Sequence, residues 1–534
     1  MAAQAFLETM AATIGADKVL GADRASERYG ASTMGVQRVI AGAVRPASSD
    51  EVRSVVQVAV QTGVPLYPVS TGNNWGYGSA NPVMDGCVVV DLSGMRQIVD
   101  FDPETGLVTL EPGVTQRMLR AYLDERGLAF LCPVSGAGPD CSLIGNALER
   151  GYGITPHADH FLSIMSLEAV LADGRLYRPP LAELGCSDVD RAFKWGVGPF
   201  LDGMFSQGSF GIVTRMTIAL APIPERVEAL FFGVPEDAML EDAVHAVRAV
   251  LREVGGVTGS VNLMNMHRVL SMMEPYPRDR LDANGLIEAS CLQQMARRNQ
   301  VMPWMGAGAL YGNAKVVRAA KSVIRQRLRG VSKRLVFFTP GSVSWLNRLS
   351  AHLPGAPGRS ARKIFGTLDK TLTLLAGEPS EIALPLAYWL SGRMPEAGQP
   401  MNPARDGCGL LWYSPLVPMK PQGVRTYVEM VKRICIEHRI EPLITLTSVS
   451  DRCFDSTVPI LFDRADPQAV ERAGQCYRAL LAAGRDAGCV PYRAPVDAMR
   501  FFMPDNTPYW EIVSGLKHLL DPSGILSPGR YVRS

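Results

Sequence analysis

Two glycine-rich segments constrain the fold of this chain more than any other feature. Residues 70–78 read STGNNWGYG, and residues 133–160 read PVSGAGPDCSLIGNALERGYGITPHADH. Glycine permits left-handed backbone angles and close approach, so backbone N–H groups in such loops can converge on a phosphate. The first segment follows a short apolar run, 64–69, that indicates a strand. The second is too rich in glycine for one long helix, and we expect a loop with a short helical turn near Leu148.

Neither segment matches a familiar nucleotide motif. The chain has no GxGxxG placed after a strand in Rossmann style and no GxxxxGK[ST]. Nicotinamide and Walker-type sites are therefore not supported. The residues alone leave two possibilities open, which are a dinucleotide held by several loops and ordinary wide turns.

Composition excludes several classes of protein. Lys+Arg 54 against Asp+Glu 52 gives a net charge of +2, so no strong basic field favours nucleic acid. The sequence has no apolar run of about 18 residues and no secretory signal, so we expect a cytoplasmic protein outside the membrane. The ten cysteines form no CxxC pair, which favours reduced thiols. His157 and His160 have no third ligand nearby, so no metal site is expected.

Helical and strand patterns alternate along the chain, as in α+β or α/β proteins. Ser49 and Asp50 are candidate N-caps of a helix that ends at Gly63. Residues 107–110 indicate a strand and Thr115 the cap of the next helix. A helix at 314–329 carries six basic residues and no acid. We interpret it as a solvated face, with steering of an anionic ligand or partner as the alternative.

Five blocks in this order give a family resemblance: PVSTGNNWGYG (68–78), GNALERGYGITPHADH (145–160), GPFLDGMFSQGSFGIVT (198–214), PYR (491–493) and DPSGILSPGR (521–530). Together they resemble the vanillyl-alcohol oxidase / p-cresol methylhydroxylase flavoprotein family. The resemblance implies an α+β fold with a two-part FAD-binding domain and a cap domain built on an antiparallel sheet. The implied domains are 1–225 (FAD-binding), 226–489 (cap, covering the isoalloxazine ring) and 490–534 (completing the FAD-binding domain). Glycine-rich loops become fewer after about residue 225, which agrees with this division.

The resemblance also implies which residues contact FAD. The first loop would surround the pyrophosphate, the second would line the flavin, and residues 212–213 would lie beside the adenine. The cofactor-binding positions implied in this way are Ser70, Thr71, Gly72, Asn73, Asn74, Trp75, Gly145, Asn146, Glu149, Arg150, Gly151, His160, Ile212, Val213 and Arg530. For Trp75 we favour packing over catalysis.

Phenol-oxidising members of this family hold the substrate as a phenolate with two tyrosines and one arginine. The matching residues here are Tyr77, Tyr492 and Arg493. The expected activity is hydride transfer from the benzylic carbon of a para-substituted phenol to flavin. A larger aromatic or secondary-metabolite substrate is the alternative, and a non-catalytic flavin-binding protein is a third hypothesis. The electron acceptor stays open between oxygen and a cytochrome, and a homo-oligomer is possible.

The chain departs from the family pattern in its substrate pocket. A His-His pair before the YR motif is replaced by Asp455 and Ser456. An acidic residue that assists proton transfer in the oxidase aligns with Ala137, for which Asp140 is a candidate substitute. A tyrosine after the RGxG motif becomes Ile154.

The sites of covalent flavin attachment also differ. Leu410 stands where the oxidase has its linking histidine, and Asn73 and Asn74 occupy the loop in which other oxidases have one. We therefore expect non-covalent FAD. Cys132 is the alternative, as a candidate for a cysteinyl link.

Overall fold

The computed structural model describes residues 2–352, 366 and 368–533. The chain forms two compact units, each described here by itself. The first comprises Met1–Gly153, Asp159–Pro222 and Ala494–Ser534, and the second comprises Ile154–Ala158 and Ile223–Arg493. The sequence-based domain boundaries were drawn at 225/226 and 489/490. The second unit instead runs from Ile223 to Arg493, and Ile154–Ala158 groups with it.

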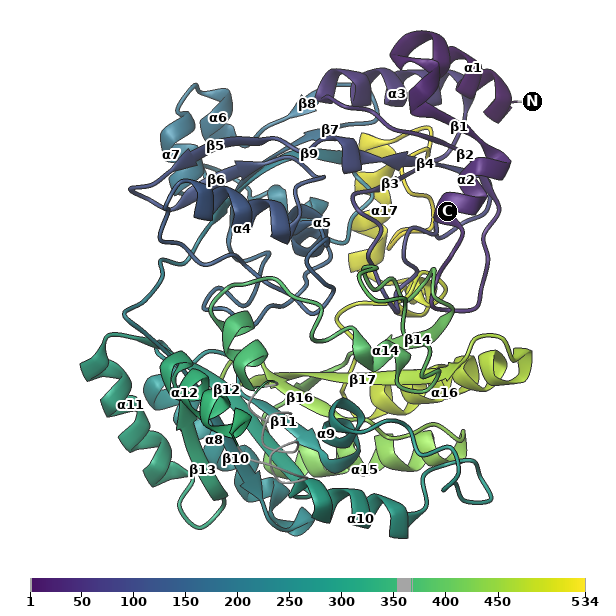
Figure 1. Cartoon of the computed structure of the whole chain (residues 1–534). Coiled ribbons are helices and arrows are strands. Elements are labelled where there is room, and N and C mark those ends of the chain that lie inside the picture. The colour runs from purple at the N-terminus through teal and green to yellow at the C-terminus, as the bar shows by residue number, and fades with distance from the viewer. Residues whose placement is uncertain (1, 353–365, 367, 534) are drawn as a thin grey trace. The chain divides into compact units, whose positions relative to one another are not determined.

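A mostly parallel sheet forms one half of the first unit (Figure 1). Its strand order is β1 (Val19–Gly21), β2 (Ile40–Val44), β4 (Cys87–Asp91) and β3 (Leu66–Val69). The helices of this half are α1 (Ala2–Ile14), α2 (Ala22–Tyr29) and α3 (Ser49–Thr62). Leu66 of β3 also pairs in parallel with Leu526, and the Leu66 N–H donates to the Ile525 carbonyl at 2.7 Å. The end of the chain therefore extends this sheet beyond β3.

Helix α3 forms where the sequence predicted a helix, with its cap one residue earlier than expected. The N-cap is Ser48, whose side chain accepts from the Glu51 N–H, and not Ser49 or Asp50. Gly63 ends the helix with a left-handed φ of 68°. Because Ser48 has extended backbone angles, its hydroxyl can reach the first free N–H groups of the helix.

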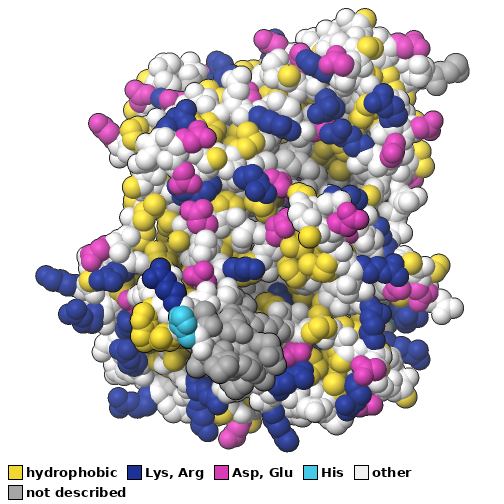
Figure 2. All heavy atoms as spheres, viewed as in Figure 1, with side chains coloured by type: hydrophobic (Ala, Val, Ile, Leu, Met, Phe, Trp, Pro, Cys, Tyr) yellow, Lys and Arg dark blue, Asp and Glu magenta, His cyan; other side chains and the backbone are white. Residues whose placement is uncertain are grey.

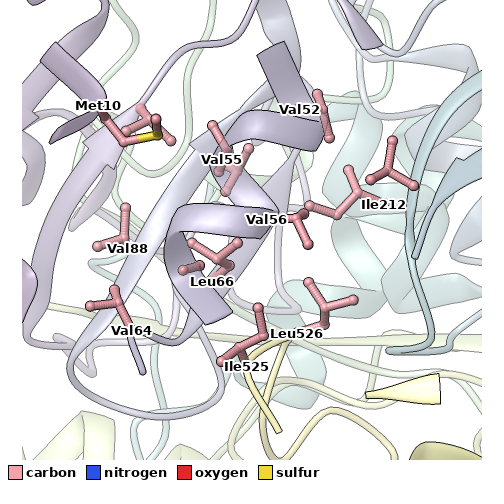
Figure 3. Packing of buried hydrophobic residues seen from close by; sticks show 14 of the residues in the cluster. Met10, Val52, Val55, Val56, Val64, Leu66, Val88, Ile212, Ile525 and Leu526 are labelled. Carbon is pink, nitrogen blue, oxygen red and sulfur yellow. The ribbon is translucent and has the colours of Figure 1, made fainter. Parts of the chain in front are cut away.

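The core of this half lies between α3 and the sheet. Figure 3 shows valines of α3 packed beside apolar side chains of the strands and of the C-terminal segment. The labelled members of the cluster are Met10, Val52, Val55, Val56, Val64, Leu66, Val88, Ile212, Ile525 and Leu526. Apolar burial therefore joins the N-terminal third of the chain to its last residues.

An antiparallel sheet forms the other half of the first unit. Its strand order is β5 (Ile98–Asp102), β6 (Leu107–Leu110), β9 (Ile212–Ala219), β7 (Ile164–Val170) and β8 (Leu176–Tyr177). The associated helices are α4 (Gln116–Glu125), α5 (Leu143–Leu148), α6 (Pro180–Glu183), α7 (Ser187–Ala192) and α17 (Pro508–Leu520). Thr115 caps α4 as predicted. Short 3₁₀ turns occupy Ala16–Lys18, Leu92–Gly94, Asp202–Phe205 and Met499–Phe502.

The second unit is built on a large antiparallel sheet. Its strand order is β13 (Lys333–Phe338), β10 (Arg226–Val234), β12 (Trp304–Gly312), β11 (Asn262–Asn265), β16 (Thr445–Ser448), β17 (Cys453–Asp463) and β14 (Cys408–Tyr413), with β15 (Leu416–Pro418) also paired to β17. Its helices are α8 (Leu240–Val254), α9 (Met266–Met273), α10 (Ala289–Asn299), α11 (Ala314–Arg327), α12 (Pro340–Ala351), α14 (Pro385–Tyr388), α15 (Pro421–Glu437) and α16 (Pro467–Asp486), with a 3₁₀ turn at Asp237–Met239. The predicted antiparallel-sheet cap is thereby confirmed.

The basic helix α11 is partly neutralised within its own unit. Lys321 lies 2.6 Å from a carboxylate oxygen of Glu228 on β10, and Arg327 pairs with Glu253 of α8. On the face shown in Figure 2, basic and acidic side chains are interspersed. Among the described residues, no helix has the length and apolar character needed to span a bilayer.

Candidate active site

The structure brings the two glycine-rich loops of the first unit together. The Asn73 side chain donates to the Asp140 carbonyl at 3.1 Å, and the Ser142 N–H donates to the Thr71 hydroxyl at 3.1 Å. The Trp75 indole N–H donates to the Ala137 carbonyl, also at 3.1 Å. Trp75 is buried, so this bond gives it a structural role as a clamp between the loops.

Glycine is required at two kinds of position in these loops. Gly72 and Gly76 have φ values of 71° and 74°, in the left-handed region that favours glycine. A Cβ at Gly145 would lie 2.2 Å from the Ser70 hydroxyl, so a side chain there would displace that hydroxyl. The Gly145 N–H is held by the Ser142 hydroxyl, the N-cap of α5.

The residues after α5 form a second close contact. Asn146 Nδ2 and His160 Nδ1 lie 2.6 Å apart, and His160 is buried. A Cβ at Gly151 would lie 2.2 Å from Asn146 Oδ1, and one at Gly153 would lie 2.3 Å from His160 Nε2. Both glycines are therefore needed for the Asn146–His160 contact, which fixes the orientation of the imidazole.

Glu149 and Arg530 form a buried ion pair although they are 381 residues apart in sequence. Arg530 also donates to the Tyr67 hydroxyl at 3.3 Å. Burial raises the pKa of Tyr67, and the Arg530 charge opposes that shift. Burial opposes the charged form of Arg530, but the Glu149 carboxylate holds its pKa above the ordinary value. Sequence reasoning missed Tyr67, because nothing in strand β3 marks it as more than an apolar position.

Arg150, Ile212 and Val213, which were also predicted to contact the cofactor, lie outside the contacts described so far. Arg150 adopts a left-handed φ of 54°, and its Nε donates to the Ser206 hydroxyl at 3.0 Å. Ile212 and Val213 begin β9, where both are buried, and Ile212 packs in the core beneath α3. Ile212 therefore has a packing role in this unit.

The joined loops fit a dinucleotide cofactor. Left-handed glycines, the close approach of Gly145 to the Ser70 hydroxyl, and a partly buried set of amide, hydroxyl and guanidinium groups occur within one unit. These are the groups that bind phosphate and flavin oxygens and nitrogens in proteins.

Tyr77 lies at the end of the first loop and is buried. Its N–H donates to the Asn74 carbonyl at 3.1 Å, and its carbonyl accepts from the Val496 N–H at 3.0 Å. A Cβ at Gly78 would lie 2.7 Å from Val496. The loop that carries Tyr77 is thereby fixed against the backbone three residues after Arg493.

Tyr492 and Arg493 end the second unit. The Tyr492 N–H donates to the Ser414 carbonyl at 3.3 Å, and Pro491 forms an antiparallel bridge with Pro415. Arg493 is 8% exposed. These bonds place the segment carrying both residues beside the chain that leads into β15.

Asp455 and Ser456 are neighbours on β17 but point to opposite faces of the sheet. The Ser456 hydroxyl accepts from the Tyr427 hydroxyl of α15 at 2.8 Å, so it faces that helix. Asp455 is 4% exposed, and no described residue hydrogen-bonds its Oδ1. Burial raises the pKa of Asp455 to about 7, against the opposing effect of Arg493. Of these two departures from the family, only Asp455 lies on the face away from α15.

The structure also shows the surroundings of the other positions at which the sequence departs from the family pattern. Asp140 forms a bidentate pair with Arg117, with Nε–Oδ1 at 2.9 Å, and both side chains are about half exposed. Cys132 is fully buried, and its Sγ donates to the Gln116 carbonyl at 3.4 Å. Leu410 is buried on β14, and the Ile154 carbonyl accepts from the Tyr311 hydroxyl at 3.2 Å. Of the two acidic residues at these positions, Asp455 is buried and Asp140 is half exposed.

The raised pKa of the buried Asp455 carboxyl group should make the free energy of unfolding depend on pH. Its folded pKa of about 7 lies above the ordinary value of 3.8, so between these values the folded state binds more protons than the unfolded state. The free energy of unfolding therefore falls as pH rises through this window. Urea unfolding at pH 5 and pH 8 should show a smaller loss for Asp455→Asn than for the unsubstituted protein. The exposed Asp463→Asn is the control, and an equal loss in Asp455→Asn would contradict the assignment.

Comparison with known proteins agrees with the site geometry. A family model described as "FAD binding domain" matches residues 40–178, which include both glycine-rich loops. The chain is 33% identical to 1'-carboxy-chondrochloren decarboxylase of Chondromyces crocatus, over 94% of this chain and 92% of the relative. It is 27% identical to the 4-cresol dehydrogenase [hydroxylating] flavoprotein subunit of Pseudomonas putida, over 91% and 87%. The crystal structure of p-cresol methylhydroxylase with substrate bound superposes with a TM-score of 0.85 at 25% identity, covering 99% and 97%.

The fold and the joined loops define an FAD-linked oxidoreductase. The chain belongs to the vanillyl-alcohol oxidase / p-cresol methylhydroxylase flavoprotein family. The family and the α+β fold expected from the five sequence blocks are confirmed.

Proposed function

We propose that this flavoenzyme oxidises a para-substituted phenol at its benzylic carbon. Tyr77, Tyr492 and Arg493 bind the phenolic oxygen. The proposal is carried by the match of Tyr77, in the GYG of the first loop, and of the Tyr492–Arg493 pair to the phenolate-binding pattern that the family resemblance implies. The bond from the Val496 N–H to the Tyr77 carbonyl supports it, because it fixes the Tyr77 loop to the segment just after Arg493.

The electrostatics of these residues favour a bound phenolate. A free phenol has a pKa of about 10, and a nearby guanidinium with two hydroxyl donors favours the anionic form. Arg493 is buried, so its charge acts in a medium less polarisable than water. A phenolate releases electron density into the ring, which makes the para-benzylic C–H a better hydride donor.

The protein and its cofactor have separate tasks in this scheme. FAD, when bound, supplies the hydride acceptor, and the oxidised substrate is a p-quinone methide. Tyr77 and Tyr492 orient the ring through its oxygen, and Arg493 holds the negative charge. Glu149, Arg530, Asn146 and the two loops bind the cofactor.

A conservative change at Tyr77 tests the proposal. Tyr77→Phe removes one donor to the phenolate, and a hydrogen bond to a charged group contributes about 1.5–3 kcal/mol. We expect kcat/KM for 4-ethylphenol to fall by roughly 10- to 100-fold. Steady-state assays with 4-alkylphenols, vanillyl alcohol and eugenol measure it. Tyr509→Phe, at a tyrosine that is 66% exposed, is the control. Equal rates in both variants would refute the role of Tyr77.

The flavin is proposed to be held without a covalent bond. Leu410 and Asn73–Asn74 offer no linking histidine, and the Cys132 thiol is buried against a carbonyl. Acid precipitation of the purified holoenzyme should therefore release the yellow colour into the supernatant. Colour that stays with the pellet would overturn this proposal and make Cys132→Ser the next variant to examine.

A larger secondary-metabolite substrate is the second candidate. It is favoured by the 33% identity to a protein named 1'-carboxy-chondrochloren decarboxylase and by the replacement of the family's His-His pair with Asp455 and Ser456. Turnover of extended phenols with no turnover of simple 4-alkylphenols would favour this candidate.

Reoxidation of the reduced enzyme in air distinguishes oxygen from a cytochrome as electron acceptor.

A further inference from the structure

One face of the sheet in the second unit carries a row of polar side chains. In the strand register, Asn262 of β11 is paired with Thr447 of β16, and Thr447 is paired with Asp455 of β17. Directly paired residues share a face of the sheet, and neighbouring strands lie about 4.8 Å apart. We call Asn262, Thr447 and Asp455 the polar row. Thr445, two residues from Thr447, lies on the same face in the next row.

Several acceptors on this face are buried and lack a partner. Asn262 Oδ1, Thr445 Oγ1 and Asp455 Oδ1 are inaccessible to solvent, and no described residue hydrogen-bonds them. Buried polar atoms in folded proteins nearly always have a hydrogen-bond partner, since leaving one unpaired is costly. Three such atoms on adjoining strands of one face indicate a binding site, in which a bound molecule would supply the missing hydrogen bonds.

This face is distinct from the one packed on the helices. Ser456 points to α15 through Tyr427, and the neighbouring Phe454 is fully buried. Alternation along β17 directs Asp455 to the other side. Leu416 is paired with Asp455, and the Tyr492 N–H donates to Ser414, two residues before Leu416. The polar row therefore shares its face with Ser414, the backbone partner of Tyr492.

We propose that the polar row is a subsite for a neutral hydrogen-bond donor, a hydroxyl or an amide N–H, on the para substituent of the phenolic substrate. The proposal rests on the proposed phenol-oxidising function and narrows its substrate class. The hydrogen of such a group would be donated to one of the buried acceptors of Asn262, Thr445 and Asp455. Because these atoms are buried, an ammonium group would pay a large desolvation cost there, so a neutral donor is favoured over an ammonium.

Matched phenols test the subsite by binding alone. The oxidised holoenzyme is titrated with 4-(2-hydroxyethyl)phenol and 4-propylphenol, then with 4-(3-hydroxypropyl)phenol and 4-butylphenol, and the flavin difference spectrum gives each Kd. We expect a hydroxylated member to bind about ten-fold tighter than its alkyl partner, the effect of one well-made buried hydrogen bond. 4-(2-Aminoethyl)phenol should show no such gain.

Single substitutions test which residues cause the tighter binding of the hydroxylated phenols. Asn262→Leu and Asp455→Leu should each abolish the preference for the hydroxylated phenol over its alkyl partner. Thr445→Val, which keeps the side-chain shape, gives the same test if a leucine variant does not fold. Ser456→Ala is the matched control on the opposite face and should keep the preference.

The outcomes separate this proposal from the function on which it rests. Alkylphenols that bind with no preference for the hydroxylated partners overturn the subsite and leave the proposed function intact. A preference that survives both leucine variants also overturns it. A holoenzyme whose flavin spectrum responds to none of the phenols overturns both proposals.

Discussion

Replacing Arg493 with alanine should slow reduction of the flavin by a phenolic substrate by at least about 100-fold. The guanidinium is the one cation that the proposal places on the phenolate, and Arg493 is 8% exposed. Without it, a bound phenol stays protonated near neutral pH, because its pKa returns toward about 10. Anaerobic stopped-flow measurement of flavin absorbance after mixing with 4-ethylphenol gives the rate constant.

The same variant offers a chemical rescue. As the pH approaches about 10, free phenolate becomes available, and the rate of Arg493→Ala should rise toward that of the unsubstituted enzyme. Arg452→Ala is the control, since its side chain is 81% exposed. A rate in Arg493→Ala within about three-fold of the control at pH 7 would remove Arg493 from the phenolate site.

Replacing Arg530 with methionine should destabilise the first unit by about 3 kcal/mol and weaken flavin retention. The change leaves the Glu149 carboxylate, 16% exposed in its side chain, without its ion-pair partner, and removes the donor to Tyr67. Urea unfolding followed by circular dichroism measures stability, and flavin fluorescence measures release. The double variant Arg530→Met with Glu149→Gln should recover part of the loss, because it also removes the unpaired charge.

An exposed ion pair gives the matched control for that experiment. Arg433 and Glu437 of α15 lie 3.0 Å apart, with side chains 60% and 53% exposed. Arg433→Ala should change stability by less than about 1 kcal/mol. A similar loss in Arg530→Met and Arg433→Ala would mean that the Glu149–Arg530 pair contributes no more than a surface pair.

The elements that were predictable from sequence depend on local signals. Helix α3 ends at Gly63 and α4 begins at Thr115 because glycine and N-cap residues act within a few residues of their own position. The antiparallel cap followed from the family resemblance. The N-cap of α3 was misplaced by one residue, since Ser48, Ser49 and Asp50 are all good caps.

The contacts between the loops were not predictable in the same way. Asn73 and Trp75 donate to the backbone carbonyls of Asp140 and Ala137, and a carbonyl group is the same in every residue. The opposite directions of Asp455 and Ser456 follow from strand alternation, but only once β17 is known to be a strand through both residues. The polar row needed the register of three strands from distant parts of the chain.

The bridge between Leu66 and Leu526 has a consequence for how the protein is made. Leu66 is translated long before Leu526, with which it pairs at the outer edge of β3. Until then β3 presents unpaired backbone groups, a template for association with other chains. Most of the second unit, Ile223–Arg493, is synthesised before that segment. The sheet therefore stays open at β3 until the segment around Leu526 has been made, and that segment then covers an edge of the kind that promotes association between chains.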